Sequence, residues 1–488
     1  MAIIVPQADR ALLEGPGYVP VRFWAVRGLS FGVVALLLYG FHTAVAPKLG
    51  IYDVRLLVLS VLFATLAVSL NLINGITGQF SIGHAAFYLI GAITAGKLSV
   101  TFISAANLRA PVWLFLMVLA GAAAAALAGL VVGLPSLRLR GDYLAVATLG
   151  FGEIVNVIVR NQDGGDKSIG GLNLGGPYGL QDIPKITQIF WILLLFVFTL
   201  AIARNLLKSA HGVSFLAVRE DELAADATGV NPTKVKVTAF VLGAAVAGMT
   251  GALFAHYNGS ISPDDFKMDT SFLLVAMVVI GGTGSITGAA CAGIGLKLLE
   301  EGLRAIHQIP AVDLFSLILT AIALFLLYNF LKRREWLQFN GALRIPFGLL
   351  GAVACAALLY AAYRLYGSGL SVVLKVAGEA VIAGALLGLL ITPTRVSALP
   401  RFGMLGLSLV AIVSASPLAA KGMHAIGPLE KLLGSTMYTP SDLRWAVFSL
   451  ALVLVMLLRP QGLLGHQELS WAFVSSLFRP PKRREVLA

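Results

Sequence analysis

Long apolar segments separated by short polar ones set the pattern of this chain. A membrane-spanning helix needs about 20 consecutive, predominantly apolar residues, and the apolar runs provide about a dozen candidates when the short arms 272–280 and 286–298 are counted as one interrupted pair. They lie at residues 29–46, 54–73, 79–95, 112–134, 143–159, 190–202, 236–256, 272–280, 286–298, 312–331, 347–365, 376–391, 403–413 and 445–458. The pattern therefore predicts an all-α polytopic membrane protein with about eleven to thirteen transmembrane helices.

Glycine and polar residues interrupt two parts of this pattern. The run 79–95 opens on a polar, glycine-rich element, and the arms 272–280 and 286–298 are separated by GGTGS. Such breaks often mark discontinuous helices along a transport pathway, although tight turns and close helix packing use the same small residues. We therefore expect glycine-broken or re-entrant segments at both places.

Polar side chains inside the predicted spans supply candidate pathway residues. Gln79, Ser81 and His84 could hydrogen-bond a zwitterionic solute, or His84 could simply bond a neighbouring helix. Glu153 lies inside the run 143–159, where an acid either has a functional role or forms a satisfied interhelical contact. The candidate translocation residues are Gly78, Gln79, Ser81, His84, Glu153, Gly281, Gly282 and Gly284.

One charged helix stands out in this apolar chain. Residues 214–232 read SFLAVREDELAADATGVNP, and a charge at the centre of a bilayer costs roughly 3 kcal/mol or more. This helix must therefore lie in water between two spans. Ser214 is expected to cap its start, Gly229 to end it in the left-handed conformation, and Asn231 with Pro232 to open the next span.

Composition and charge support this membrane assignment. The 488 residues are 58% hydrophobic and only 12% charged, whereas soluble domains are about 25% charged. The net charge of +12 is explained by Lys and Arg in short cytoplasmic loops, so we do not expect nucleic-acid binding. Cys291 and Cys355 lie in apolar runs and are expected to be buried small hydrophobic residues, with no disulfide or metal site.

The basic loops predict an orientation. Residues 1–28 form a cytoplasmic tail, 29–309 a core of spans that carries the helix 214–229 on the inside, and 466–488 a basic cytoplasmic tail. Residues 442–465 hold the last span, and residues 310–441 supply additional spans. Both termini are thus predicted to be cytoplasmic.

Several segments together resemble one family, the LivM-type permeases, which are membrane subunits of branched-chain amino-acid ABC importers. The segments are LNLINGITGQFSIGHAAFYLIGAITAG (70–96), LRLRGDYLAVATLGFGEI (137–154), VREDELAADATG (218–229), HYNGSISPDD (256–265), VVIGGTGSITG (278–288) and LRPQGLLG (458–465). Residues 310–441 lack a counterpart in the resemblance. The importer coupling motif is also altered, because Leu223 precedes Ala224 and Ala225 where the family has Glu, and the acid stands one place earlier at Glu222.

The resemblance implies an inner-membrane permease that moves leucine, isoleucine and valine. It implies two cytoplasmic ATP-binding subunits that carry ATP and Mg, a second homologous permease, and an extracytoplasmic solute-binding protein that meets the outer loop 168–180. No GxxxxGK[ST] motif, metal-ligand spacing or nucleophile triad is present in the sequence, so we expect a transport subunit with no cofactor of its own. The residues expected to contact the ATPase are Ser214, Arg219, Glu220, Asp221, Glu222, Ala224, Ala225 and Gly229.

Three alternatives stay open at this point. An ion-coupled secondary transporter could use Glu153 and His84 as relay groups, and it would not need the charged helix 214–229. Related permeases carry urea, amides or aromatic acids. The two permeases of one importer could also be identical copies of this chain.

Overall fold

The computed structural model describes residues 21–102, 110–136, 142–162, 173–305, 309–310, 437–438 and 462. These residues form helices joined by turns and loops, apart from one short antiparallel ladder in which β1 (Ile309–Pro310) pairs with β2 (Met437–Tyr438). The predicted all-helical membrane class is confirmed. Within the described residues, five helical segments are long and apolar enough to cross a membrane, namely Ile51–Ile76, Ala110–Leu134, Tyr143–Arg160, Ile189–Lys208 and Pro232–Asn258.

The larger predicted number of spans stays a prediction. The apolar runs from 312–331 to 445–458 lie outside the described residues. Residues 21–49 belong to a unit of their own, in which α2 (Val21–Ala44) covers most of the first predicted span and is followed by η1 (Ala46–Lys48). Leu36 and Leu37 of α2 are exposed, as suits a helix that faces lipid.

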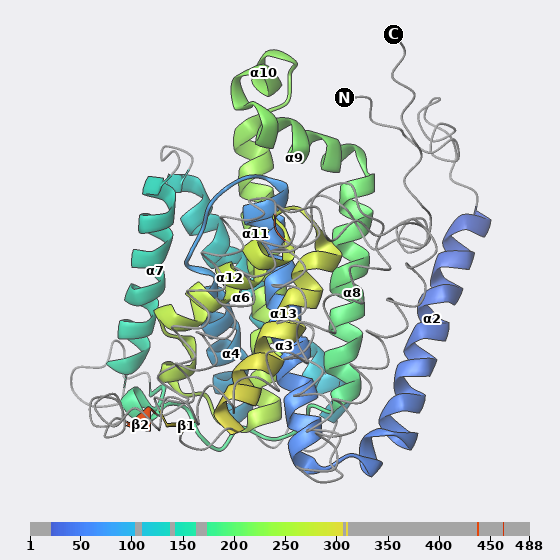
Figure 1. The fold of residues 1–488 in the computed structure, drawn as a ribbon, viewed down its shortest axis with the longest axis vertical. Helices are drawn as coiled ribbons and strands as arrows, with labels where there is room; N and C mark the ends of the chain where they lie inside the picture. The colour runs from blue at the N-terminus through green and yellow to red at the C-terminus, as the bar shows by residue number, and fades with distance from the viewer. Residues whose placement is uncertain are drawn as a thin grey trace, which may run out of the picture. The chain divides into compact units, whose positions relative to one another are not determined.

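The second unit holds the helical bundle (Figure 1). Its long helices are α3 (Ile51–Asn71), α4 (His84–Thr101), α6 (Ala110–Ser136), α7 (Asp142–Arg160), α8 (Ile189–Lys208), α11 (Pro232–Asn258), α12 (Met268–Gly281) and α13 (Ile286–Ala305). The shorter elements are η2 (Leu72–Ile76), η4 (Gly176–Tyr178), α9 (Ala210–Glu220), α10 (Glu222–Ala227) and η5 (Pro263–Phe266).

Two of the spans form the centre of this bundle. The most apolar stretch of α3 with η2 is 89% buried and that of α11 is 67% buried, against 28% for α6, α7 and α8. α11 packs against α6 and α4, while α13 packs against α3 and α12. α6, α7 and α8 therefore lie at the periphery of the bundle, with most of their surface directed away from it.

Small residues allow the central helices to touch. A Cβ atom on Gly91 of α4 would lie 2.3 Å from the backbone of Gly248 of α11. One on Gly248 would lie 2.4 Å from the carbonyl oxygen of Gly121 in α6. Three helices thus meet backbone to backbone, the usual means of association in a membrane, where apolar burial supplies little driving force between helices.

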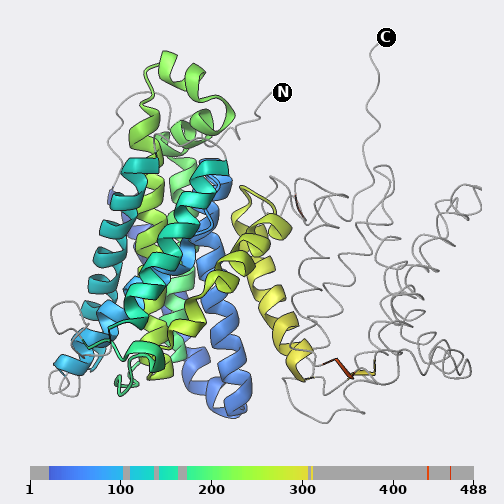
Figure 2. The same cartoon turned by 90° about the vertical axis from the view of Figure 1, so that its left-hand side faces the viewer.

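The two ends of the bundle differ. α9 and α10 lie together at one end in both views (Figures 1 and 2). At the opposite end, the loop before α8 pairs with the loop after α11, with Leu180 and Ile261 bonded to each other and the N–H of Ile183 donating to the carbonyl of Gly259 over 3.1 Å. Polar backbone groups of each of these loops therefore find hydrogen-bond partners in the other loop.

The predicted span 79–95 needs a correction. α3 continues into η2, a π-helical turn, and residues 77–83 are not helical. α4 begins at His84 and extends to Thr101. The physical reason lies in the glycines, because Gly78 has a φ of +71° and a Cβ on Gly83 would lie 2.1 Å from the carbonyl oxygen of Thr148. The predicted break between the arms 272–280 and 286–298 is found between α12 and α13.

Candidate coupling surface and translocation elements

The charged segment begins earlier than its sequence suggested. Ser209, and not Ser214, caps α9, since its side chain accepts a hydrogen bond from the N–H of Gly212 over 3.3 Å. Ser214 lies inside the helix, where its hydroxyl donates to the carbonyl of Ala210. The prediction of Ser214 as the cap was wrong because two serines compete, and only the backbone of Ser209 is extended as an N-cap requires.

The segment is also two helices rather than one. α9 ends at Glu220, and Asp221 is extended with φ −155° and ψ +113°. Its carboxylate accepts hydrogen bonds from Leu223 and Ala224 at 2.9 and 3.1 Å and so caps α10. An aspartate that can cap competes with helix continuation, which explains the division of the predicted single helix.

The end of the segment matches its prediction. Gly229 has a φ of +86°. Asn231 caps α11 by accepting a hydrogen bond from the N–H of Lys234 over 3.0 Å, and Pro232 is the first residue of that helix. These local signals hold α10 between two defined turns.

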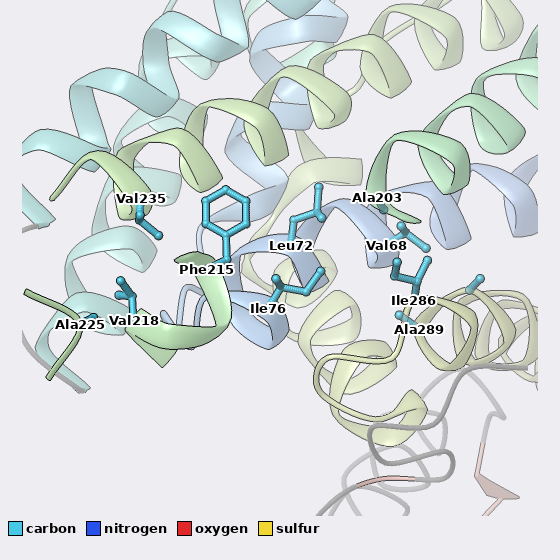
Figure 3. Packing of buried hydrophobic residues seen from close by; sticks show 11 residues of the cluster. Val68, Leu72, Ile76, Ala203, Phe215, Val218, Ala225, Val235, Ile286 and Ala289 are labelled. Carbon is cyan, nitrogen blue, oxygen red and sulfur yellow. The ribbon is translucent and has the colours of Figure 1, made fainter. Parts of the chain in front are cut away.

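α9 has a buried face that joins it to the spans. Phe215 and Val218 belong to a hydrophobic cluster, and the Phe215 ring lies between Val235 and Leu72 in Figure 3. The buried members of this cluster are Val68, Leu72, Ile76, Ala203, Phe215, Val218, Ala225, Val235, Ile286, Ala289 and Ala290. They come from α3, η2, α8, α9, α10, α11 and α13, and α9 itself packs against α8, α10, α11 and η2.

The outward face of the same segment is partly apolar. Leu223, at the position where the family motif has an acid, is 72% exposed, and Val213 is 66% exposed. Glu220, Asp221 and Asp226 are exposed beside them. We call the exposed residues of α9 and α10 the coupling surface.

Two charged residues of α9 and α10 contact other elements of this chain. Glu222 forms an ion pair with Lys236 of α11 at 2.7 Å. Arg219 packs on Gly78, since a Cβ on Gly78 would lie 3.1 Å from the Arg219 side chain. Gln79 donates from Nε2 to the carbonyl of Lys236 over 3.4 Å and to Thr77 over 3.0 Å. The structure thus brings Gly78 and Gln79 to the base of the coupling surface.

His84 and Ser81 lie further into the bundle. His84 is fully buried at the start of α4, and its Nε2 lies 2.7 Å from the hydroxyl of Ser69. The hydroxyl of Ser69 also lies 2.8 Å from the carbonyl oxygen of Leu66, which ties the imidazole of His84 to α3. Among the described residues, Nδ1 of His84, Oγ of Ser81 and Oε1 of Gln79 are buried and have no hydrogen-bond partner.

The glycine break is held by a side chain from α3. Gly282 and Gly284 have φ values of +116° and +96°. The N–H of Gly284 donates to Oδ1 of Asn71, and Nδ2 of Asn71 donates to the carbonyl of Ser285, both over 3.0 Å. Gly281 lies against Gly288, with 2.4 Å from its added Cβ to the Gly288 carbonyl oxygen, and Gly462 lies equally close to Gly282.

Glu153 stands apart from these elements. It is partly exposed on α7, and within the described part of the chain it has no hydrogen bond or ion pair. The prediction that Cys291 is buried was wrong, because its side chain is exposed on α13, and Cys355 lies outside the described residues. No group of three or more His, Cys, Asp or Glu residues able to hold a metal lies within the described residues.

Two asparagines were not singled out from the sequence. Asn71 and Asn74 stand three residues apart within an apolar run. Polar residues inside a span generally have a partner and a role, so this spacing was a usable signal.

These observations define the class of protein before its family. The structure combines helices of bilayer length, glycine-broken segments and a charged, capped helical pair at one end. This combination is typical of a multi-pass membrane transport subunit. Residues 53–327 match the family described as "Branched-chain amino acid transport system / permease component". The chain belongs to this family, which confirms the predicted class of transport subunit rather than enzyme.

Individual relatives agree with the family. The permease protein LivM of the high-affinity branched-chain amino acid transport system from Salmonella typhimurium is 33% identical over 290 residues, which cover 52% of this chain and 64% of the relative. LivM from Escherichia coli K12 is 33% identical over 310 residues, or 57% of this chain and 69% of the relative. LivH from the same organism is 31% identical over 142 residues, 29% of this chain and 46% of the relative. No solved structure matches the chain.

Proposed function

We propose that this chain is the permease subunit of an ATP-driven importer that moves leucine, isoleucine and valine across the inner membrane. The relatives LivM and LivH carry the name of a branched-chain amino acid transport system. The observation that carries the mechanism is the position of α9, whose buried face belongs to the cluster shared by η2, α11 and α13. Its outward face is free to receive a partner.

Two cytoplasmic ATP-binding subunits, which hold ATP and Mg, are the proposed partners of the coupling surface. Leu223 supplies an exposed apolar contact, and the exposed acids beside it favour a groove with basic groups. ATP binding would draw the two subunits together and push α9 against the spans. Both termini of this chain would then lie in the cytoplasm, as the basic loops predict.

The remaining partners follow from the family. The likeness to LivH supports a second, homologous permease beside this one, and a homodimer is the alternative. An extracytoplasmic binding protein would deliver the solute at the outer end, near the loop 168–180. The elements proposed to line the pathway are the segment 77–84 and the break 281–285, and Glu153 is a weaker candidate because, among the described residues, no hydrogen bond or ion pair joins it to them.

The docking surface can be tested with Leu223→Asp. A pull-down through a tag on this chain, followed by mass spectrometry, should recover an ATPase and a second permease with the wild type. The variant should lose about 90% of the ATPase and keep the second permease, because a charge replaces the central apolar contact. Arg219 and Glu222 are poorer test positions, since they also bind Gly78 and Lys236 of this chain.

The matched control is Tyr178→Asp. Tyr178 is 88% exposed at the opposite end of the bundle, and its replacement should leave the recovery of the ATPase unchanged. Recovery of this chain alone, with leucine uptake that persists without ATP and collapses with an uncoupler, would instead favour the ion-coupled transporter. Uptake of urea, amides or aromatic acids in place of leucine would retain the importer and change the solute.

A further inference from the structure

Two asparagines around one π-helical turn hold the two interruptions of the bundle. Asn71 is the last residue of α3, and Asn74 lies in η2. Each uses both ends of its side-chain amide to bind one N–H and one C=O of non-helical backbone. π-Helical turns are rare and are frequent at functional sites.

Asn71 binds the break between α12 and α13. Its Oδ1 accepts from Gly284 and its Nδ2 donates to Ser285, each over 3.0 Å. The side chain is fully buried. Gly75 leaves room for it, because a Cβ at Gly75 would lie 1.9 Å from Oδ1 of Asn71 and 2.4 Å from the nitrogen of Gly284.

Asn74 binds the segment before α4 in the same way. Its Oδ1 accepts from the N–H of Ser81 over 3.1 Å, and its Nδ2 donates to the carbonyl of Ser81 over 3.0 Å. The non-helical segment 77–83, which Asn74 binds, also touches α9, since Gly78 lies against Arg219.

Membrane physics explains why such bonds are needed. Non-helical backbone at membrane depth is tolerated only when protein or water satisfies its polar groups. Each asparagine satisfies one donor and one acceptor. It also fixes the position of the break relative to η2, because the two bonds constrain both the distance and the orientation of the backbone.

The π-helical turn η2 also belongs to the hydrophobic cluster that contains Phe215 and Val218 of α9. Leu72 and Ile76 of η2 pack with Phe215 of α9 and with Ile286 at the start of α13. We propose that Asn71 and Asn74 are positioning residues that make η2 and both breaks move as one body when α9 is displaced. This proposal rests on the proposed function, because it assigns the route by which the docked ATPase would drive the pathway.

The test compares Asn71→Leu with Asn71→Asp in cells that express the full chain. Leucine is close to asparagine in size but has no polar group. Aspartate keeps an oxygen that can accept from the N–H of Gly284, and in its protonated form it also offers a donor to the carbonyl of Ser285. The readouts are the rate of radiolabelled leucine uptake and the amount of ATPase that co-purifies with the chain.

The expected result separates positioning from assembly. Asn71→Leu should lower the maximal uptake rate about tenfold or more, because Gly284 and Ser285 lose their partners. The leucine concentration for half-maximal uptake should stay within about twofold, and ATPase recovery should be unchanged. Asn71→Asp should retain more of the rate than Asn71→Leu.

Thr65→Val is the matched control on the same helix. Thr65 is buried and donates only to the carbonyl of Val61 within α3, over 2.8 Å, so its replacement should leave the uptake rate within about twofold of the wild type. A wild-type rate in Asn71→Leu, or equal rates in the leucine and aspartate variants, would overturn the proposal. If Asn71→Leu does not accumulate in the membrane, the same pair of substitutions at the half-buried Asn74 decides the question.

Failure of the proposed function looks different. Wild-type uptake that persists after ATP depletion, with no ATPase recovered, would remove the importer itself, whatever the asparagine variants do.

Discussion

At the scale of single residues, the bundle depends on positions where a side chain is absent. Gly248 of α11 touches the backbone of Gly121 in α6 and that of Gly91 in α4. Neither contact could survive a Cβ without separation of the helices. Close approach of this kind supplies the dispersion energy that holds helices together in lipid.

We predict that Gly248→Val destabilises the folded chain. The added side chain begins 2.4 Å from the Gly121 carbonyl oxygen and 2.5 Å from Cβ of Ala125, and overpacking of this kind costs about 1–3 kcal/mol. Thermal unfolding of the detergent-solubilised protein measures the loss.

The control for this substitution is Gly150→Val in α7, where an added Cβ meets nothing within 4 Å. Its midpoint should stay close to that of the wild type. Equal midpoints for the Gly248 and Gly150 variants would show that α11 can move away from α6 without cost.

At the scale of elements, the division between α9 and α10 is set by one cap. Asp221 satisfies the first N–H groups of α10, a helix of only 6 residues. Such a short helix is not stable through its own backbone bonds, because nucleation is unfavourable. Ala225, the buried residue of α10, and the Asp221 cap therefore hold it in place.

We predict that Asp221→Ala frays α10 while α9 stays folded. Loss of an N-cap costs about 1 kcal/mol, so hydrogen exchange at the amides of Leu223 and Ala224 should become several times faster. Asp226→Ala, which removes an exposed acid from the same helix without a cap, is the control. Unchanged exchange in the Asp221 variant would mean that packing of Ala225 alone retains the helix.

At the scale of the whole molecule, the two ends have different chemistry. The α9–α10 end presents an apolar and acidic surface, whereas the opposite end carries two hydrogen-bonded loops and ion pairs between side chains. There Asp264 of η5 bonds Arg160 at the end of α7 and Lys267 before α12, the latter at 3.0 Å. One carboxylate thus connects two helices and the turn between α11 and α12.

This connection makes this end of the bundle sensitive to acid. The hydrogen bond from Lys267, with the charges of Lys267 and Arg160, holds the pKa of Asp264 below its ordinary value. A carboxyl whose pKa is lower in the folded state contributes stability above its unfolded pKa and loses it as the pH falls through the folded pKa. The contribution is small, because Asp264 is largely exposed.

We therefore predict that Asp264→Asn lowers the thermal midpoint at neutral pH, and that its difference from the wild type disappears in acid below the folded pKa. The control is Asp182→Asn. Asp182 is exposed in the loop before α8 and has no ion pair among the described residues, so its replacement should cause no pH-dependent change of the thermal midpoint. A difference for Asp264→Asn that is the same at both pH values would point to lost packing instead of lost charge.

Local patterns in the sequence determined the membrane class, the approximate positions of most described spans and both glycine breaks, whereas the start of α4 at His84 had to come from the structure. They do so because hydrocarbon admits only long apolar helices, because charges must lie in water, and because a positive φ strongly favours glycine. The turn at Gly229 and the Asn231 cap were predictable for the same local reason. The sequence also marked the charged segment 214–229 as lying outside the spans, and binding of a partner there stays a prediction.

Only the tertiary structure decided which groups meet. Asn71 and Ser285 are 214 residues apart, and no local pattern indicates that their bond forms. The choice of Ser209 over Ser214 and the cap at Asp221 depend on where α8 ends and on how Phe215, Val218 and Ala225 enter the shared cluster. Hydrogen bonds and close contacts across a bundle are set by the packing of whole helices, and for this reason the contact of Gly78 with Arg219 could not be predicted from the sequence.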